Sequence, residues 1–211
     1  MENVTDRTSD PFGMRPEGRP AVPGYGDANA DFHLVGDHPG VHGGAETGIP
    51  FTGTAAACRL QDALARVGLV RVTGAPPRVD NLFCSYRYMC VPDGDGPTPA
   101  DYERAEARFD AELRAITAHV LLPVGRATTE HVLAQYTARL DKVDTADAAG
   151  IHGIEIPGNG FLVVPIRDPR DWERGDADAL VDALSDLMAR DYRRESDLGR
   201  FLVGSEPYFV R

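Results

Sequence analysis

Side chains able to support catalysis are concentrated in one glycine-rich segment, Val35–Gly53, and these are Asp37, His38, His42, Glu46 and Phe51. Carboxylates and imidazoles can activate or orient a water molecule, and an aromatic face can stack on a flat ligand. The glycines let the backbone approach a ligand closely, so that its N–H groups can hold an anion. The segment is therefore predicted to form a reactive or anion-binding site. Its glycine content alone would also fit a structural turn or an unrelated phosphate loop.

The cysteines, in contrast, do not form a ligand set. Cys58, Cys84 and Cys90 contain no CxxC pair, and an odd count gives no disulfide framework. We expect buried or inert thiols. The sequence predicts no bound metal and no cofactor.

The elements that must position the glycine-rich segment alternate between strands and helices. Short apolar runs predict strands at 32–35, 69–72, 81–89, 119–124, 151–156 and 161–166. Helical spacing predicts helices over 54–67, from Thr98 and Pro99 onward, from Thr128 or Thr129 to Tyr136, and over 171–192. This alternation favours an α/β fold with three layers, αβα, around a mainly parallel sheet. Ligands bind beyond the carboxyl ends of strands in such sheets, and the segment leaves the strand at 32–35.

Composition sets limits on organisation and partners. Residues 1–29 are rich in Gly, Pro, Asp and Arg and predict an extended N-terminal arm, and residues 30–211 predict a single domain. The net charge of -11 argues against generic nucleic-acid binding, although a local arginine cluster would still permit it. No apolar run is long enough to span a bilayer, and the N-terminus lacks the pattern of a signal peptide, so we expect a cytoplasmic protein without membrane contact. We also expect a monomer.

The order of short motifs resembles that of the uracil-DNA glycosylase superfamily, closest to its families four and five. Gly36-Asp37-His38-Pro39-Gly40 is similar to the first motif, and His42-Gly43-Gly44 and Phe51-Thr52-Gly53 follow as in family five. The lead-in Val22–Asp27, the stretch Cys90–Pro99 and the run Leu121–Ala127 are similar to further family segments. The resemblance covers about residues 20 to 137.

This resemblance implies the three-layer fold and excision of a deaminated base, uracil first, from a nucleotide flipped out of DNA. Asp37 falls at the position of the acid that orients water, and His42 matches a family-five histidine. Phe51 matches the ring that stacks on the base. Gly36, His38, Pro39 and Gly40 are expected to shape the base pocket.

The resemblance fails at several positions. Families four and five carry four iron–sulfur cysteines, but here only Cys90 matches and the later position aligns with Ala105, so no cluster is expected. Val164 stands where the second motif has its histidine, and Tyr86 stands where an asparagine reads the uracil edge. Both positions are retained as base-pocket candidates.

Arg167, two residues beyond Pro165, is a candidate catalytic substitute, because a guanidinium can stabilise an anionic leaving group. The alternative is that it pairs with Asp168 or Asp171. Two other functions remain open: a degenerate member that binds a nucleic acid, nucleotide or protein without chemistry, and an unrelated phosphate-binding α/β domain.

Overall fold

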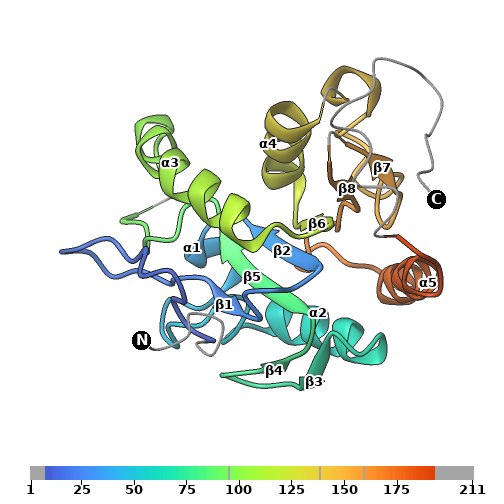
Figure 1. The fold of residues 1–211 in the computed structure, drawn as a ribbon, viewed down its shortest axis with the longest axis horizontal. Coiled ribbons are helices and arrows are strands. Elements are labelled where there is room, and N and C mark those ends of the chain that lie inside the picture. Colours follow the sequence, from blue (N-terminus) through green and yellow to red (C-terminus); the bar gives the residue numbers. More distant parts are fainter. Residues whose placement is uncertain (1–7, 95, 138, 159, 193–211) are drawn as a thin grey trace.

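A sheet with the strand order β1-β5-β2-β6-β8-β7 forms the centre of the fold (Figure 1). The computed structural model describes residues 8–94, 96–137, 139–158 and 160–192. The inner strands β5 (Leu82–Tyr86), β2 (Phe32–Gly36), β6 (Val120–Pro123) and β8 (Leu162–Val163) are parallel. The outer strands β1 (Tyr25–Gly26) and β7 (Ile156–Pro157) are antiparallel to their neighbours. The expected mainly parallel sheet is confirmed.

Helices cover both faces of this sheet and give the three layers that were predicted. On one face lie α2 (Ala55–Arg66) and α5 (Asp176–Met188), whose buried leucines share one core cluster with Leu34 and Leu122. On the other face lie α3 (Pro99–Ile116) and α4 (Arg126–Tyr136), which bury Phe109 and Leu133. Figure 1 shows the two pairs on opposite sides of the strands. The strands of the centre are therefore buried on both faces, as a parallel sheet requires.

Two helix starts follow from side chains that accept hydrogen bonds from the first turn. The Thr54 hydroxyl accepts from the Ala57 backbone N–H, and α2 begins at the next residue, Ala55. Thr98 and Asp101 form a reciprocal capping box at the start of α3, with Pro99 in the first turn. Both starts agree with the sequence prediction.

The start of α4 differs from the prediction of a threonine cap. Gly125 is the N-cap, with φ of 79°, and no side chain caps the helix. The Thr129 hydroxyl lies inside the helix and donates to the Gly125 carbonyl oxygen instead. Because glycine accepts a positive φ without strain, the chain enters α4 almost directly from β6. This short connection places the N-terminus of α4 at the carboxyl edge of the sheet.

The strand predicted at 151–156 is wrong except at its last residue, where β7 begins. Residues 151–153 form a turn, Gly153 has φ of 74°, and its N–H donates to the Pro165 carbonyl oxygen. The helix predicted from Asp171 begins at Asp176, because Gly175 before it adopts φ of 104°. In both places a glycine with positive φ breaks a pattern that the neighbouring apolar residues would have continued.

The strand predicted at 69–72 forms outside the main sheet. It is β3 (Val70–Val72), which pairs antiparallel with β4 (Arg78–Val79) in a separate two-stranded sheet. The remaining elements are short: α1 (Pro39–His42) lies within the glycine-rich segment, and a 3-10 turn spans Leu140–Lys142.

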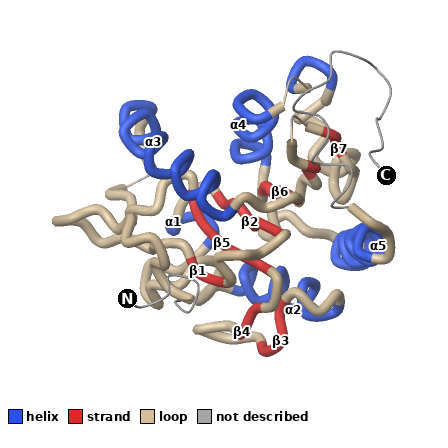
Figure 2. Tube along the Cα trace, in the orientation of Figure 1, coloured by secondary structure: helices blue, strands red, loops and turns tan. Residues whose placement is uncertain are grey.

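The expected arm contributes to the fold where it is described. Val22 is buried in the core and β1 extends the sheet beside β5. Residues 8–24 form the loops beside α3 that Figure 2 draws in tan. Residues 1–7 of the arm and 193–211 of the expected domain lie outside the described residues. The described part of the chain contains no helix long and apolar enough to cross a membrane.

Candidate active site

A cleft of about 630 Å³ lies beyond the carboxyl ends of β2, β6 and β8. The chain leaves β2 toward α2 on one face of the sheet and leaves β6 toward α4 on the other face. Adjacent strands whose connections diverge in this way open a crevice between them, and ligands of α/β proteins bind there. The volume lies within the range of about 300–1,000 Å³ found for ligand pockets.

Asp37 lines this cleft directly after β2. One of its carboxylate oxygens, Oδ1, accepts a hydrogen bond of 2.9 Å from the Tyr102 hydroxyl and one of 3.3 Å from Arg87. Among the described residues no hydrogen-bond partner is found for the other oxygen, Oδ2, and the side chain is 15% exposed. The carboxylate is thus held on one side and open to a ligand on the other.

The two groups that hold Asp37 support each other. The Arg87 guanidinium lies 4.7 Å above the Tyr102 ring and also donates to the Ala127 carbonyl oxygen. Burial, together with the charge of Asp37, raises the pKa of Tyr102, so its hydroxyl remains a donor at neutral pH. Arg87 follows β5 and Tyr102 lies on α3, so the acid is fixed from two further elements.

His42 is positioned by the backbone of Asp37 itself. The Asp37 N–H donates to His42 Nδ1 over 2.9 Å, so the neutral imidazole must carry its proton on Nε2. Nε2 lies 3.5 Å from Asp168 Oδ2, which is longer than a good hydrogen bond. Burial tends to raise the pKa of Asp168, but contacts with His42 and Arg170 outweigh it and hold that pKa well below its usual range. Asp168 therefore stays charged beside the imidazole.

Three aromatic rings pack together behind this wall of the cleft. His42 stacks on Phe51 with ring centres 5.7 Å apart, and Phe51 packs against Tyr86 at 5.2 Å. A side chain at Gly36 would meet the Tyr86 ring at 2.6 Å, which explains the glycine at the end of β2. Tyr86 is 1% exposed, and its hydroxyl donates to the Gly43 carbonyl oxygen and accepts from the Phe51 N–H.

The structure therefore divides the sequence-predicted site residues. Asp37, His42 and Arg167 line the cleft. Gly36, Phe51, Tyr86 and Val164 do not line it, and the last three are buried in the core cluster. These side chains fill the space behind the cleft because Tyr86 and Phe51 are large and Gly36 admits them.

The other members of the predicted pocket build the turn that carries His42. Pro39 and Gly40 belong to α1, and His38 is its N-cap. His38 is buried, and burial lowers its pKa. None of these three lines the cleft.

Arg167 is engaged by carboxylates other than those expected. It donates to Asp176 over 2.9 Å and to Glu173 over 3.1 Å, rather than to Asp168 or Asp171. Asp168 instead contacts His42 and Arg170. Arg167 is thus tied to the start of α5, because the turn before Gly175 brings Glu173 and Asp176 to it.

Sequence reasoning did not assign Tyr102, Asp168 and Arg170 to the site, and it considered Arg87 only as part of a possible stacking and phosphate surface at residues 86–88. A usable signal existed for Arg87 and Asp168, since each follows a strand at the carboxyl edge of the sheet. Tyr102 gave no local signal, because it lies on an amphipathic helix, 65 residues from Asp37 along the chain.

The cysteines do not fit the iron–sulfur cluster that the resemblance to families four and five implies. A four-cysteine cluster needs one thiolate more than the three in the whole chain. Cys58 is exposed on α2, Cys84 is buried in β5, and Cys90 packs against Tyr88 and Met89. Among the described residues no group of three or more His, Cys, Asp or Glu could hold a metal ion.

Comparison with known proteins agrees with the motif order. The model of the family described as "Uracil DNA glycosylase superfamily" matches residues 23–187. The type-5 uracil-DNA glycosylase of Thermus thermophilus is 31% identical over 135 residues, covering 62% of this chain and 59% of that protein. Its counterpart from Pyrobaculum aerophilum is 32% identical over 142 residues, covering 64% and 62%. The chain thus spans less than two thirds of the length of these relatives.

Proposed function

This chain belongs to the uracil-DNA glycosylase superfamily, and from that premise we propose that it hydrolyses the N-glycosidic bond of a deaminated base in DNA. Uracil is the first candidate base. The observation that supports this most is the position of Asp37, with one oxygen fixed by Tyr102 and Arg87 and the other open to the cleft. A flipped nucleotide would enter this cleft from the carboxyl edge of the sheet.

In the proposed reaction Asp37 orients a water molecule toward C1′ of the sugar. The bond from C1′ to the base nitrogen breaks, and its electron pair leaves with the base. The water oxygen bonds to C1′ and gives a proton to Asp37, while the departing base takes up a proton from solvent. The carboxylate also stabilises the positive charge that develops on the sugar.

The start of α4 supplies backbone N–H groups that can stabilise the negative charge on the departing base. Gly125, Arg126, Ala127 and Thr128 line the cleft, and no side chain caps this helix. The first N–H groups of a helix have no partner within it and carry a partial positive charge. They can therefore receive an anion in the cleft, a role that Val164 at the second-motif position cannot perform.

An excision assay tests the proposal. Oligonucleotides containing uracil, hypoxanthine or xanthine are incubated with the purified protein at low and at molar salt, and base release is measured. Asp37→Asn should lower release at least ~100-fold, because removing a group that acts on developing charge or transfers a proton costs roughly 10²–10⁴ in rate. Asp171→Asn is the matched control, since Asp171 lines the same cleft and contacts neither Asp37 nor His42. Absence of release from all three substrates would overturn the proposal.

A second candidate function, binding without chemistry, is favoured by one specific observation. Tyr86 stands at the base-reading position, is buried, and uses its hydroxyl for two backbone hydrogen bonds. If the protein binds DNA tightly, releases no base, and retains the same affinity in Asp37→Asn, this second function replaces the first.

A further inference from the structure

A second pocket, of about 150 Å³, lies beside the active-site cleft and is rimmed by arginines. Three segments form it: arm residues 16–19, the residues that follow β5, and the outer side of α3. Its arginines are Arg19, Arg87, Arg104 and Arg108, and we call it the arginine pocket. Tyr88, Met89, Cys90 and Ala105 also line it, and most of the lining surface is apolar.

Positive charge at this pocket exceeds the negative charge that faces it. Asp101 is the acidic residue among the lining residues, and it is already used by Arg104 and by the cap of α3. Among the described residues, Arg108 has no hydrogen bond or ion pair, and Nε of Arg87 is buried without a partner. In a chain with a net charge of -11, this hollow carries four guanidinium groups, and the carboxylates that pair with them are Asp101 and, through Arg87, Asp37, so positive charge is locally in excess.

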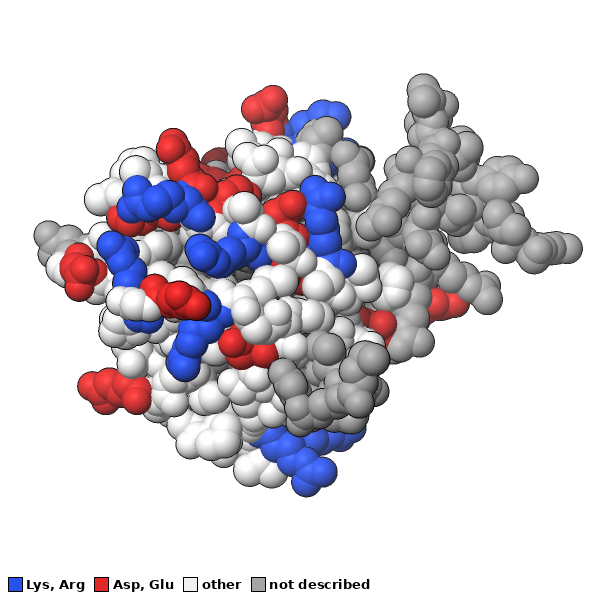
Figure 3. Space-filling view, turned by 60° about the vertical axis from the view of Figure 1, so that its left-hand side comes forward, with Lys and Arg blue, Asp and Glu red and all other residues white. Residues whose placement is uncertain are grey.

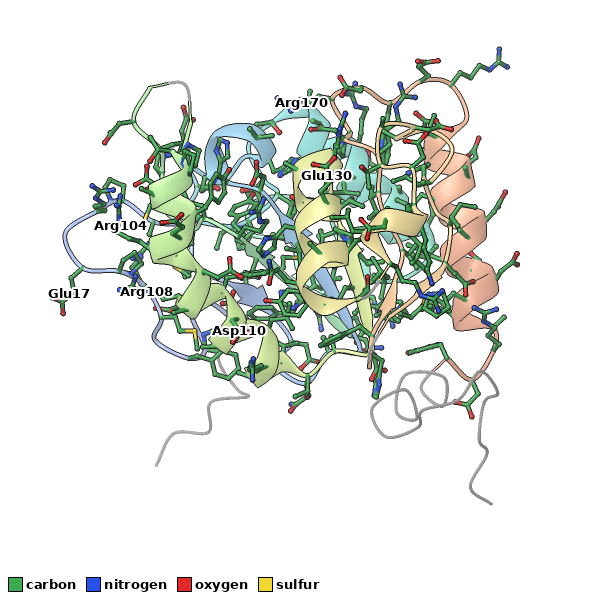
Figure 4. All side chains as sticks on the ribbon, turned by 90° about the horizontal axis from the view of Figure 1, so that it is seen from above. Glu17, Arg104, Arg108, Asp110, Glu130 and Arg170 are labelled. Carbon is green, nitrogen blue, oxygen red and sulfur yellow. The ribbon has the colours of Figure 1, made fainter. Side chains whose placement is uncertain are left out.

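The arrangement is visible on the surface. Figure 3 turns the side that carries α3 and the arm forward, and several basic side chains stand close together there, with carboxylates between them. In Figure 4, Arg104 and Arg108 extend from α3 toward the arm loop, and Glu17 points away at the tip of that loop. The side chains of Arg19 and Arg104 are 58% and 66% exposed, so a ligand can reach them.

Guanidinium groups above an apolar floor can bind a phosphate ester, with the phosphate at the guanidinium groups and the attached sugar or base on the floor. A guanidinium binds phosphate oxygens in pairs, and the floor can accept a sugar or the face of a base. A free anion such as sulfate would contact only the arginines at the rim of the pocket and not its apolar floor. The chemistry therefore points to a nucleotide unit, with its phosphate at the arginines.

Arg87 connects the arginine pocket to the cleft. It lines the pocket, and its Nη1 bonds to Asp37 Oδ1 in the cleft. Both hollows lie at the carboxyl edge of the sheet, one after β5 and the other after β2, β6 and β8. A nucleic-acid strand that places one nucleotide in the cleft can thus place a neighbouring one at the arginine pocket.

We propose that the arginine pocket binds a phosphate of the DNA strand flanking the nucleotide held in the cleft. This rests on the proposed function for the choice of DNA as ligand. Cys90 and Ala105, the two positions that the resemblance aligns with cluster cysteines, both line this pocket.

Binding of a fluorescently labelled single-stranded oligonucleotide to the full chain tests this proposal by polarisation. The double variant Arg104→Ala, Arg108→Ala should bind at least ~10-fold more weakly at 0.1 M salt. The slope of log K against log salt should become shallower by about 0.7 for each phosphate that the variant no longer neutralises. Arg114→Ala is the control, because Arg114 lies on the same helix, is 76% exposed and pairs with Asp110 outside the pocket. It should change affinity less than ~2-fold.

The outcomes separate this inference from the proposed function. Arginine-dependent binding without base release would contradict the excision proposal and support the proposal that the arginine pocket binds DNA phosphate. Base release with unchanged affinity in the double variant would overturn the proposal about the arginine pocket. Inorganic phosphate and dAMP serve as competitors: if dAMP binding depends on Arg104 and Arg108 while oligonucleotide affinity does not, the site takes a free nucleotide and the strand proposal is wrong.

Discussion

Tyr86→Phe tests how the glycine-rich segment is held in place. The substitution keeps the ring, which packs on Phe51 and closes the space beside Gly36. It removes only the hydroxyl, which donates to the Gly43 carbonyl oxygen and accepts from the Phe51 N–H, each over 2.8 Å. These two bonds tie together the beginning and the end of the stretch that follows His42.

The expected loss can be derived from these two hydrogen bonds. Because Tyr86 is 1% exposed, water does not replace the hydroxyl, and one backbone donor and one backbone acceptor are left without a partner. A buried group left unpaired costs about 1–3 kcal/mol, so for the two groups together we expect a loss of about 2–6 kcal/mol in the free energy of unfolding. For a chain of this size that lowers Tm by roughly 4–24 °C.

Urea and thermal unfolding followed by circular dichroism measure the loss, and amide hydrogen exchange should show faster exchange of the Phe51 N–H. Tyr136→Phe is the control, since among the described residues its hydroxyl makes only a long contact of 3.5 Å to Asp110 at a partly exposed position. We expect that control to change stability by less than about 0.5 kcal/mol. If Tyr86→Phe costs no more than the control, the hydroxyl does not hold the segment and the reasoning fails.

Three further predictions concern stability. Burial raises the pKa of Glu112 to about 7, so the folded state holds a proton that the unfolded state releases, and stability falls as pH rises from about 4.5 through 7. Glu112→Gln should remove this dependence on pH. At pH 8 the variant should unfold at a higher urea concentration than the wild type, with a free energy of unfolding larger by up to about 3 kcal/mol. Asp168→Asn should cost about 1–3 kcal/mol at pH 7. Because the pKa of Asp168 is depressed in the folded state, its contribution is lost as pH falls below the unfolded value, so the variant should also show shallower acid unfolding below about pH 4, measured by circular dichroism. Thr98→Ala removes the capping box of α3 and should cost about 1 kcal/mol in urea unfolding; equal midpoints for variant and wild type would contradict the cap.

The sequence alone determined the three-layer arrangement and much of the glycine-rich segment. Apolar strand runs alternating with amphipathic helices predict the αβα arrangement, and Thr98 predicts the start of α3, because capping depends on residues only three apart. Glycines mark the segment after β2, since Gly36 must admit the Tyr86 ring and Gly43 takes φ of 90°. Asp37 could be predicted as a site residue because it comes directly after that strand.

Only the tertiary structure decided which side chains meet Asp37 and which turn away. Tyr102 reaches Asp37 from α3 and Arg87 reaches it from the residue after β5, while Asp168 reaches His42 from the loop after β8. Their convergence depends on a strand order that places β2 between β5 and β6. The burial of Phe51 and Tyr86 likewise depends on packing volume behind the sheet edge, which no local pattern records. Residues far apart along the chain become neighbours through the sheet, so their pairing cannot be derived from spacing.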